Sequence, residues 1–328
     1  MKMALWLVAC AFTILLAHAR TVPVAAQTPM TLRYAHAGGE THTWQVWGQK
    51  FAERVAERTQ GRVKVEIYGG GQLGNERALT ESVQLGTLDL AATGAPLNQW
   101  VPEIAVMDLP FLFRSWEHSF AVLDGPIGRE LADRMLAKGF KLVGVDVLGF
   151  RHMTNNKRSL NTAADMRGLK LRVPEVAQWT LMTRALGATP VPITLTEVYL
   201  ALQQGVADGQ ENPPSTIRAQ KFFEVQKYLS LTSHMLSVTW IIANPRTFAG
   251  WPRDVQTALL EAGREASVYE RQWVRAEDDK ILDFLKSKGM NVNTPSDPES
   301  FRKATAPVWD QLGGKFPKEW IRTIQDTR

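Results

Sequence analysis

The segment GLKLRV, residues 168–173, alternates apolar and basic side chains as a half-buried β-strand does. Its leucines and valine share one face, and Lys170 and Arg172 share the other. A helical segment over residues 175–186 and a second strand, ATPVPI, over residues 188–193 follow. A succession of strand, helix and strand predicts an α/β fold.

The same alternation continues along most of the chain, which predicts an α/β layout with a parallel sheet. Residues beyond 291 predict a short strand and two helices. The other predicted strands cover residues 31–38, 62–68, 87–94, 140–149, 150–153, 206–210 and 236–244, and the other predicted helices cover 43–59, 75–85, 116–123, 128–138, 196–204 and 253–288.

Residues 1–26 have the layout of a secretory signal peptide. Lys2 precedes an apolar run over residues 4–16, which is too short to span a bilayer. Two cleavage sites compete, after Ala19 and after Ala26, and the second fits better because the first strand-like run follows it. The sequence therefore predicts an exported, periplasmic protein.

Composition limits the chemistry and the size of the protein. With 328 residues, 45% hydrophobic and 22% charged, the chain predicts a globular protein of two lobes. The only cysteine, Cys10, lies in the leader, so the mature chain has no thiol or disulfide chemistry. Removal of the leader lowers the formal net charge from +5 to +3, which suits a small anionic ligand and is too dispersed for nucleic acid.

One motif suggests an enzyme. The run GGGQLG, Gly69 to Gly74, stands between a predicted strand and a predicted helix, as a dinucleotide-binding loop does, and Asp89 follows as a potential ribose partner. An exported NAD-binding oxidoreductase is therefore one alternative. Nicotinamide cofactors are mostly cytosolic, and the leader carries no twin arginine, so a flexible loop is the preferred interpretation and no cofactor is expected.

Other catalytic and metal-binding patterns are missing from the sequence. The histidines form no H-x-x-x-H or H-E-x-x-H motif, so no metal site is predicted, although a hard cation held by carboxylates beside a ligand stays open. No G-x-S-x-G is present, and no serine or lysine stands in a recognisable nucleophile setting. We therefore expect a protein that is not an enzyme.

The strongest binding signal is a set of polar residues at strand ends. An arginine on an alternating strand commonly faces water, but Arg172 has company: Arg151 stands at the start of a preceding strand, and Asn212 ends another just before two prolines. Ligands of open α/β sheets bind beyond the carboxyl ends of strands. Because a guanidinium matches a carboxylate with two parallel hydrogen bonds, this set predicts a carboxylate receptor.

Four segments in order carry a resemblance to a known family. They are GGGQLGNERALTESVQLGTLDL (residues 69–90), DLPFLF (108–113), ADMRGLKLRVPE (164–175) and TEVYLALQQGVADGQENPP (196–214). Together they closely resemble the extracytoplasmic solute-binding proteins of TRAP transporters, of the dicarboxylate-binding type. The resemblance extends over essentially the whole mature chain, and the combination is more specific than any one segment.

The resemblance implies a two-lobed periplasmic binding protein fold, with a hinge crossed by strands and a long helix that spans both lobes. Lobe I would comprise residues 27–149 and 238–278, and lobe II residues 150–237 and 279–328. The implied partners are a small organic acid and the small and large membrane subunits of a TRAP transporter. A ligand-presenting sensor protein of the same fold is a further alternative.

The resemblance also implies a ligand-binding set. In the family, the arginine that matches Arg172 pairs with the ligand carboxylate, and Arg151 and Asn212 match further contacts. Glu76 also suits a helix N-terminus, and Leu195 and Trp240 also suit the core. The remaining implied contacts are His36, Thr93 and Gly94. Two arginines suit a C4-dicarboxylate, whereas Glu76, His36 and Glu211 suit sugar hydroxyls, so uronates and other sugar acids stay open.

Overall fold

A computed structural model describes residues 30–328; the predicted signal peptide, with Cys10, lies outside the described residues. The strands are β1 (Met30–Ala35), β2 (Val63–Tyr68), β3 (Leu90–Thr93), β4 (Lys141–Asn155), β5 (Lys170–Val173), β6 (Thr189–Pro192), β7 (Gly209–Asn212), β8 (Tyr228–Ala243) and β9 (Asn291–Asn293). The α-helices are α1 (Thr43–Arg58), α2 (Glu76–Leu85), α3 (Trp116–Asp124), α4 (Pro126–Ala137), α5 (Ala177–Ala185), α6 (Val198–Gln203), α7 (Pro214–Ala219), α8 (Pro245–Gly250), α9 (Arg253–Ser287), α10 (Pro298–Thr305), α11 (Pro307–Leu312) and α12 (Lys318–Asp326). Short 3-10 helices are η1 (Ala95–Gln99), η2 (Pro102–Asp108), η3 (Ala163–Met166), η4 (Leu195–Glu197) and η5 (Phe222–Glu224).

Helix α2 shows why the sequence pattern located most elements correctly. The Asn75 side chain caps its first turn by accepting a hydrogen bond from the backbone N–H of Ala78 at 3.0 Å. Gly86 ends the helix in the left-handed region at φ 76°, which a residue with a Cβ rarely adopts. Leu79, Thr80 and Val83 make the buried face between these ends. The predicted helix is confirmed with the predicted cap.

The sheet is mixed rather than parallel, which corrects the prediction. Its order is β2-β1-β3-β8-β4-β7-β5-β6, with β9 paired to β8. The pairs β1 with β2, β1 with β3, β5 with β6 and β5 with β7 are parallel. The pairs of β8 with β3 and of β4 with β7 and β8 are antiparallel. The alternation of strands and helices in the sequence predicts the parallel strand pairs. It does not predict the antiparallel pairing of β4 and β8, which join the parallel units.

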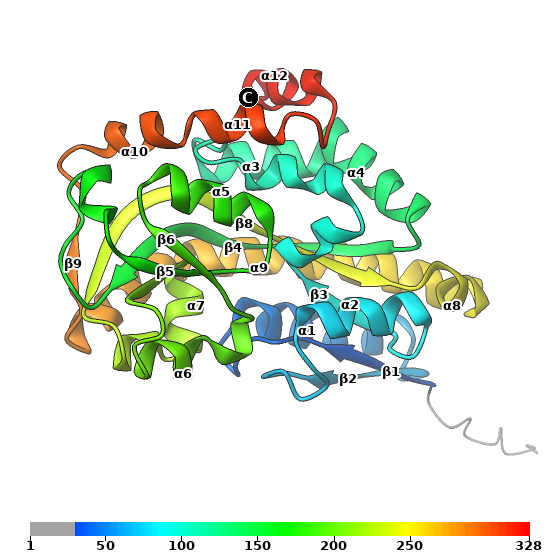
Figure 1. The fold of residues 1–328 in the computed structure, drawn as a ribbon. Coiled ribbons are helices and arrows are strands. Elements are labelled where there is room, and N and C mark those ends of the chain that lie inside the picture. The colour runs from blue at the N-terminus through cyan, green and yellow to red at the C-terminus, as the bar shows by residue number, and fades with distance from the viewer. Residues whose placement is uncertain (1–29) are drawn as a thin grey trace, which may run out of the picture.

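The two long strands β4 and β8 connect two lobes (Figure 1). The first lobe contains β1, β2 and β3, and the second contains β5, β6, β7 and β9. The sequence pattern divided β4 into two strands at residue 150, but it is one continuous strand. Its pairing with β8 shifts register between Val147 and Gly149, and Gly149 has a φ of 119°. A register shift of this kind bends a strand, so this position suits a hinge.

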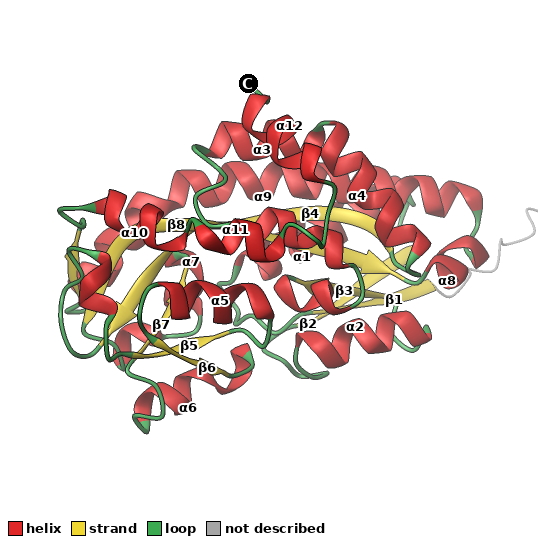
Figure 2. Cartoon of the chain, turned by 45° about the horizontal axis from the view of Figure 1, so that its top comes forward, coloured by secondary structure: helices red, strands yellow, loops and turns green. Residues whose placement is uncertain are grey.

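Helix α9, 35 residues long, packs along β4 and also contacts α1 and α7 (Figures 1 and 2). Polar side chains fix this packing. The Ser267 hydroxyl accepts hydrogen bonds from Trp47 Nε1 and from the backbone N–H of Val145, both at 3.0 Å. The Glu270 carboxylate accepts one from the backbone N–H of Val147 at 3.2 Å. The long helix is therefore attached directly beside the bend in β4.

The C-terminal helices cross from one lobe to the other. Helix α10 packs on β8 and η3, whereas α12 lies against α4, and α12 appears beside α3 and α4 in both views (Figures 1 and 2). The Trp320 indole N–H donates to Glu130 at 3.1 Å, and Arg114 donates to the backbone oxygen of Gln325 at 2.9 Å. Among residues 30–328, no helix combines the length and the apolar character needed to cross a membrane.

A buried pair of acids, Asp146 on β4 and Glu270 on α9, lies beside the bend, and both residues are 0% exposed. Burial raises the pKa of Glu270 well above its usual value, and the charge of Asp146 raises it further. Burial also raises the pKa of Asp146. The folded protein therefore holds a proton on the pair under conditions in which the unfolded chain has lost it.

Replacement of Glu270 by glutamine should remove this proton linkage. Stability of the wild type should fall as pH rises above the unfolded pKa, by about 1.4 kcal/mol per pH unit for each extra proton bound by the native state. Glu270→Gln keeps an acceptor for Val147 and supplies an N–H for Asp146, so it should lose less stability between pH 5 and pH 8. Urea unfolding at both pH values measures this. Equal pH slopes for the variant, the wild type and the surface control Glu299→Gln would contradict it.

Candidate functional site

A cavity lies between the two lobes, beside the bend of β4 and β8. A smaller adjoining cavity shares Glu76, Pro96, Arg172, Pro174 and Leu195 with it and continues toward exposed residues. The larger cavity is lined by His42, Trp44, Glu76, Gly94, Ala95, Pro96, Asp108, Leu148, Arg151, Arg172, Pro174, Trp179, Leu195, Asn212, Thr216, Ser237, Val238 and Thr239.

Arg172 is placed in this cavity by β5, between β6 and β7. It is 2% exposed, so the face of GLKLRV that the pattern assigned to water is covered at this residue. Its Nε and Nη2 donate to the backbone oxygen of Ile193 at 2.9 and 2.6 Å. Within the described chain, Nη1 has no hydrogen-bond partner and no carboxylate lies within 4 Å of the guanidinium. Burial lowers the pKa of Arg172 to about 10.

Arg151, from β4, differs from Arg172 because a carboxylate of the protein, Glu211, neutralises its charge. Its Nε and Nη2 donate to the two carboxylate oxygens of Glu211 at 2.5 and 2.8 Å. Nη2 also donates to the backbone oxygen of Glu211 at 2.8 Å, and Nη1 donates to Ser237 Oγ at 3.0 Å. Four of its five N–H groups are thus used. The guanidinium also lies 5.4 Å from the ring centre of Trp179.

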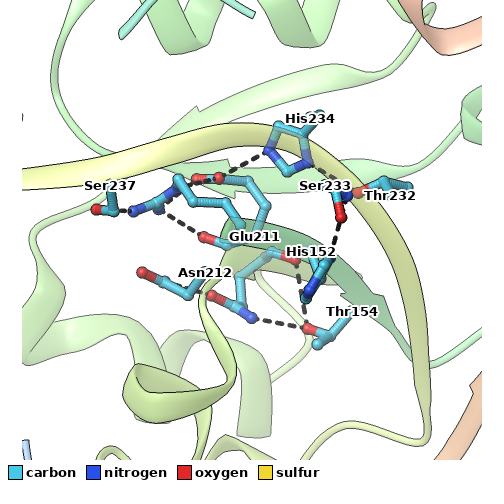
Figure 3. A network of polar contacts seen from close by, with 10 residues as sticks. His152, Thr154, Glu211, Asn212, Thr232, Ser233, His234 and Ser237 are labelled. Carbon is cyan, nitrogen blue, oxygen red and sulfur yellow. Dashed lines mark hydrogen bonds and ion pairs between the residues drawn. The ribbon is translucent and has the colours of Figure 1, made fainter. Parts of the chain in front are cut away.

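A network of polar contacts holds Glu211 in place (Figure 3). His234 Nε2 contacts a Glu211 carboxylate oxygen at 3.1 Å, and His234 Nδ1 contacts the Thr232 hydroxyl at 2.8 Å. Burial alone would raise the pKa of Glu211, but Arg151 and His234 outweigh it and hold this pKa at about 2. The carboxylate is therefore charged across the physiological range, and the Arg151–Glu211 pair carries no net charge.

Asn212 ends β7, and α7 begins two residues later at Pro214. Its Nδ2 donates to the Gln210 side chain at 2.5 Å, and the Gln210 amide in turn donates to Thr154 Oγ1 at 3.0 Å. No described residue donates to Asn212 Oδ1. The network of Figure 3 therefore orients the Asn212 amide, and its oxygen, Oδ1, is available to accept a hydrogen bond from another partner.

Two acids, Glu76 and Asp108, line the cavity together with Arg151 and Arg172. Glu76, in the first turn of α2, accepts a hydrogen bond through Oε2 from the backbone N–H of Gly94 at 2.7 Å. Asp108, at the end of η2, accepts through Oδ2 from Asn98 at 2.8 Å and from Gln178 at 3.4 Å. Loss of hydration on burial raises the pKa of Glu76 and raises the pKa of Asp108 to about 7.

The other predicted residues divide into two groups. Gly94 and Leu195 line the cavity, whereas His36, Thr93 and Trp240 do not. His36 is fully buried and contacts Gln45 at 3.0 Å, and burial lowers its pKa to about 4. Thr93 accepts a hydrogen bond from Thr80 at 3.0 Å. Trp240 packs in the main core.

Several cavity residues were not predicted from the sequence: His42, Trp44, Asp108, Trp179, Thr216, Ser237 and Thr239. Asp108 carried a usable signal, because an acid directly before the apolar run LPFLF is out of place in a buried segment. The serine and threonines carried none. Among residues 30–328, no three His, Cys, Asp or Glu side chains gather as metal ligands would.

The two lobes touch on several sides of the cavity. His42 Nε2 contacts Thr216 Oγ1 at 3.2 Å, and Gln220 donates to the backbone oxygen of Ala37 at 3.3 Å. The glycine loop also takes part: a Cβ at Gly71 would lie 2.8 Å from the Thr196 methyl group, and φ there is 74°. This loop accordingly needs glycine for a close approach between the lobes. The structure is that of a closed cleft.

Comparison with known proteins gives consistent results. Residues 34–315 match the family described as bacterial extracellular solute-binding protein, family 7. The chain is 34% identical over 302 residues to the 2,3-diketo-L-gulonate-binding periplasmic protein of Escherichia coli, covering 91% of this chain and 90% of that protein. It is 31% identical over 314 residues to the C4-dicarboxylate-binding periplasmic protein of Rhodobacter capsulatus, covering 94% and 93%.

A solved structure is similar over nearly the whole described chain. It is a TRAP periplasmic solute binding protein from a Polaromonas species, bound to D-erythronate. The two structures agree with a TM-score of 0.88 at 38% identity, over 91% of this chain and 99% of that one. The two-lobed α/β fold with a hinge is therefore the fold of this protein.

Replacing Arg151 or Arg172 by alanine should have different effects on the free energy of unfolding. Arg151→Ala leaves Glu211 buried without its cation and should cost about 3–5 kcal/mol of unfolding free energy. Arg172→Ala removes a buried charge that has no counterion and should leave stability nearly unchanged or higher. Denaturant unfolding of the two variants at pH 7 measures both. An Arg151→Ala protein as stable as the wild type would contradict the assignment of Arg151 to a structural ion pair.

Proposed function

Because the chain belongs to the bacterial extracellular solute-binding proteins of family 7, we propose that it captures a small organic acid in the periplasm and delivers it to the membrane subunits of a TRAP transporter. The relatives described above are named as periplasmic binding proteins, and the solved structure is named as a TRAP periplasmic solute binding protein. The comparisons do not favour the NAD-dependent alternative, and the glycine loop has a packing role at Thr196 that needs no nucleotide.

The observation that carries the proposal is the incomplete pairing of Arg172. A buried guanidinium without an anion is costly, because it has lost its hydration without gaining an opposite charge. Arg172 lines the cavity and has Nη1 unpartnered among the described residues. A ligand carboxylate would supply both the missing charge and the missing hydrogen bonds.

The surrounding groups would complete the carboxylate site. Arg151 retains one N–H on Nη1, because its other four donate to Glu211 and Ser237. Asn212 would add a polar contact from the end of β7. On this account Arg172 supplies the positive charge that binds the carboxylate. Arg151, held in place by Glu211, orients the carboxylate through its remaining N–H.

First-lobe residues would act when the cleft closes. Glu76 and Gly94 line the cavity from the proposed lobe I, and Leu195 lines it from the proposed lobe II. Closure removes water from the ion pair and thereby strengthens it. The ligand shifts the equilibrium between open and closed forms only by its difference in affinity for the two. His36, Thr93 and Trp240 would support this wall from behind rather than touch the ligand.

The hinge would lie where β4 and β8 bend, near residues 149 and 237. The proposed lobe I then comprises residues 27–149 and 238–278, and lobe II comprises residues 150–237 and 279–328. Packing of α12 against α4 brings the last helix onto lobe I. The C-terminal helices would therefore hold the lobes together on one side while the cleft opens on the other.

Loss of Arg172 should abolish most of the affinity. Arg172→Ala should weaken binding of an organic acid by about 2–5 kcal/mol, because the desolvated carboxylate would lack its partner. Arg172→Lys should also weaken binding, since an ammonium cannot make the two parallel hydrogen bonds. Isothermal titration calorimetry with D-erythronate, 2,3-diketo-L-gulonate and succinate measures this.

The matched control is Lys170→Ala, two residues earlier on the same strand, where the side chain is exposed and bonded to the backbone oxygen of Gly205. It removes a positive charge from β5 without reaching the cavity, so affinity should stay at the wild-type value. Unchanged affinity in Arg172→Ala, with the protein folded, would refute the proposed binding site.

A further inference from the structure

The charge balance of the cavity decides between the two ligand classes left open above, dicarboxylates and sugar acids. We infer that the cavity selects polyhydroxylated monocarboxylates over C4-dicarboxylates, with Glu76 and Asp108 as the residues that read the hydroxyl groups. This inference rests on the proposed function, because it takes Arg172 as the carboxylate anchor.

The cavity has cationic capacity for one carboxylate only. Glu211 neutralises Arg151 and occupies three of its N–H groups. Arg172 is the one cation lining the larger cavity for which the described residues provide no ion pair. No lysine lines either cavity, and Arg77, at the mouth, is exposed and paired with Glu81 at 3.1 Å.

The histidine of the cavity cannot supply a second charge. His42 is fully buried beside His36, and burial together with that neighbour lowers its pKa to about 3. Its imidazole is therefore neutral at the pH of the periplasm. It contacts the Thr216 hydroxyl at 3.2 Å. A second ligand carboxylate would have no positive partner among these groups.

Two acids line the cavity beside the arginines. Glu76 uses Oε2 for Gly94, and Asp108 uses Oδ2 for Asn98 and Gln178. Their other oxygens, Oε1 and Oδ1, accept no hydrogen bond from any described residue. A second carboxylate here would offer only acceptors to these acceptor oxygens, and it would meet a like charge wherever either acid is ionised. Ligand hydroxyl groups donate to such oxygens and would satisfy both.

Neutral groups beside the acids also suit hydroxyls. The Ser237 hydroxyl oxygen already accepts from Arg151, and the Thr239 hydroxyl oxygen accepts from Trp44 Nε1 at 3.0 Å. Each retains its own O–H to donate. The Trp179 indole N–H is buried without a partner and supplies one more donor. Mixed donors and acceptors of this kind match a chain of hydroxyl groups, each of which both donates and accepts.

The test uses ligand pairs that differ at one end. D-Erythronate and meso-tartrate share a four-carbon hydroxylated chain, and the terminal CH₂OH of the first is a carboxylate in the second. D-Galactonate and galactarate form the corresponding six-carbon pair, and succinate serves as the unhydroxylated dicarboxylate. We expect calorimetry at pH 7 to give a clear result for whichever pair binds better. The aldonate of that pair should bind at least about tenfold more tightly than the matching dicarboxylate, and also at least about tenfold more tightly than succinate.

Two variants assign the preference to the acids. Asp108→Asn and Glu76→Gln keep the shape and remove the charge. In each variant, the affinity for the aldonate should fall by about tenfold or more, while the affinity for the dicarboxylate should stay the same or rise. The ratio of aldonate affinity to dicarboxylate affinity should therefore decrease. The control is Glu319→Gln, an exposed acid on α12 far from the cavity, which should preserve the ratio. Thermal unfolding checks that every variant is folded.

The outcomes separate the inference from the proposed function. Dicarboxylates that bind as tightly as the aldonates, failure of both aldonates to bind, or a ratio unchanged in both acid variants would overturn the inference. If Arg172→Ala abolishes binding of a preferred dicarboxylate, the proposed function stands and the inference fails. If Arg172→Ala leaves every affinity unchanged, the proposed function fails as well.

Discussion

The buried guanidinium of Arg172 is the constraint on which the rest of the site depends. It is held by the backbone oxygen of Ile193 and has no carboxylate within ion-pair distance in the described chain. A buried cation is stabilised by a nearby anion, and the described residues place none within ion-pair distance of Arg172. The other arginine of the cavity, Arg151, is by contrast neutralised by its ion pair with Glu211. One arginine thus builds the site and the other is left for the ligand, although the two look alike in the sequence.

This division explains how the fold and the site work together. The parallel units β1–β3 and β5–β7 each form part of a lobe, and the long strands β4 and β8 carry Arg151 and Ser237 across the bend between them. Helix α9 is attached beside that bend by Ser267 and Glu270. In this structure Glu76, Asp108 and Arg172 line the same cavity. Under the proposed lobe division, closure would bring these two acids to Arg172.

Most of the fold could be predicted from periodicity and caps, as the Asn75 cap of α2 illustrates. The continuity of β4 could not, because a glycine at a bend looks like a strand end in the sequence. The direction of β8 was also hidden, since a strand pattern carries no information about its partner. For the site, the sequence pattern pointed to Arg172, Arg151 and Asn212, and all three line the cavity, although Arg151 lies within the continuous strand β4 rather than at a strand end. The pairing of Arg151 with Glu211 was beyond prediction, because 60 residues separate the two partners along the chain. Asp108 was missed inside an apolar run, where its polarity was the only signal.

The most direct test of the account is a crystal structure of the mature protein with D-erythronate bound. The account predicts the ligand carboxylate within hydrogen-bond distance of Arg172 Nη1, with the Arg151–Glu211 pair intact and the ligand hydroxyls directed at Glu76 and Asp108. A ligand whose carboxylate lies away from Arg172, or which displaces Glu211 from Arg151, would contradict it.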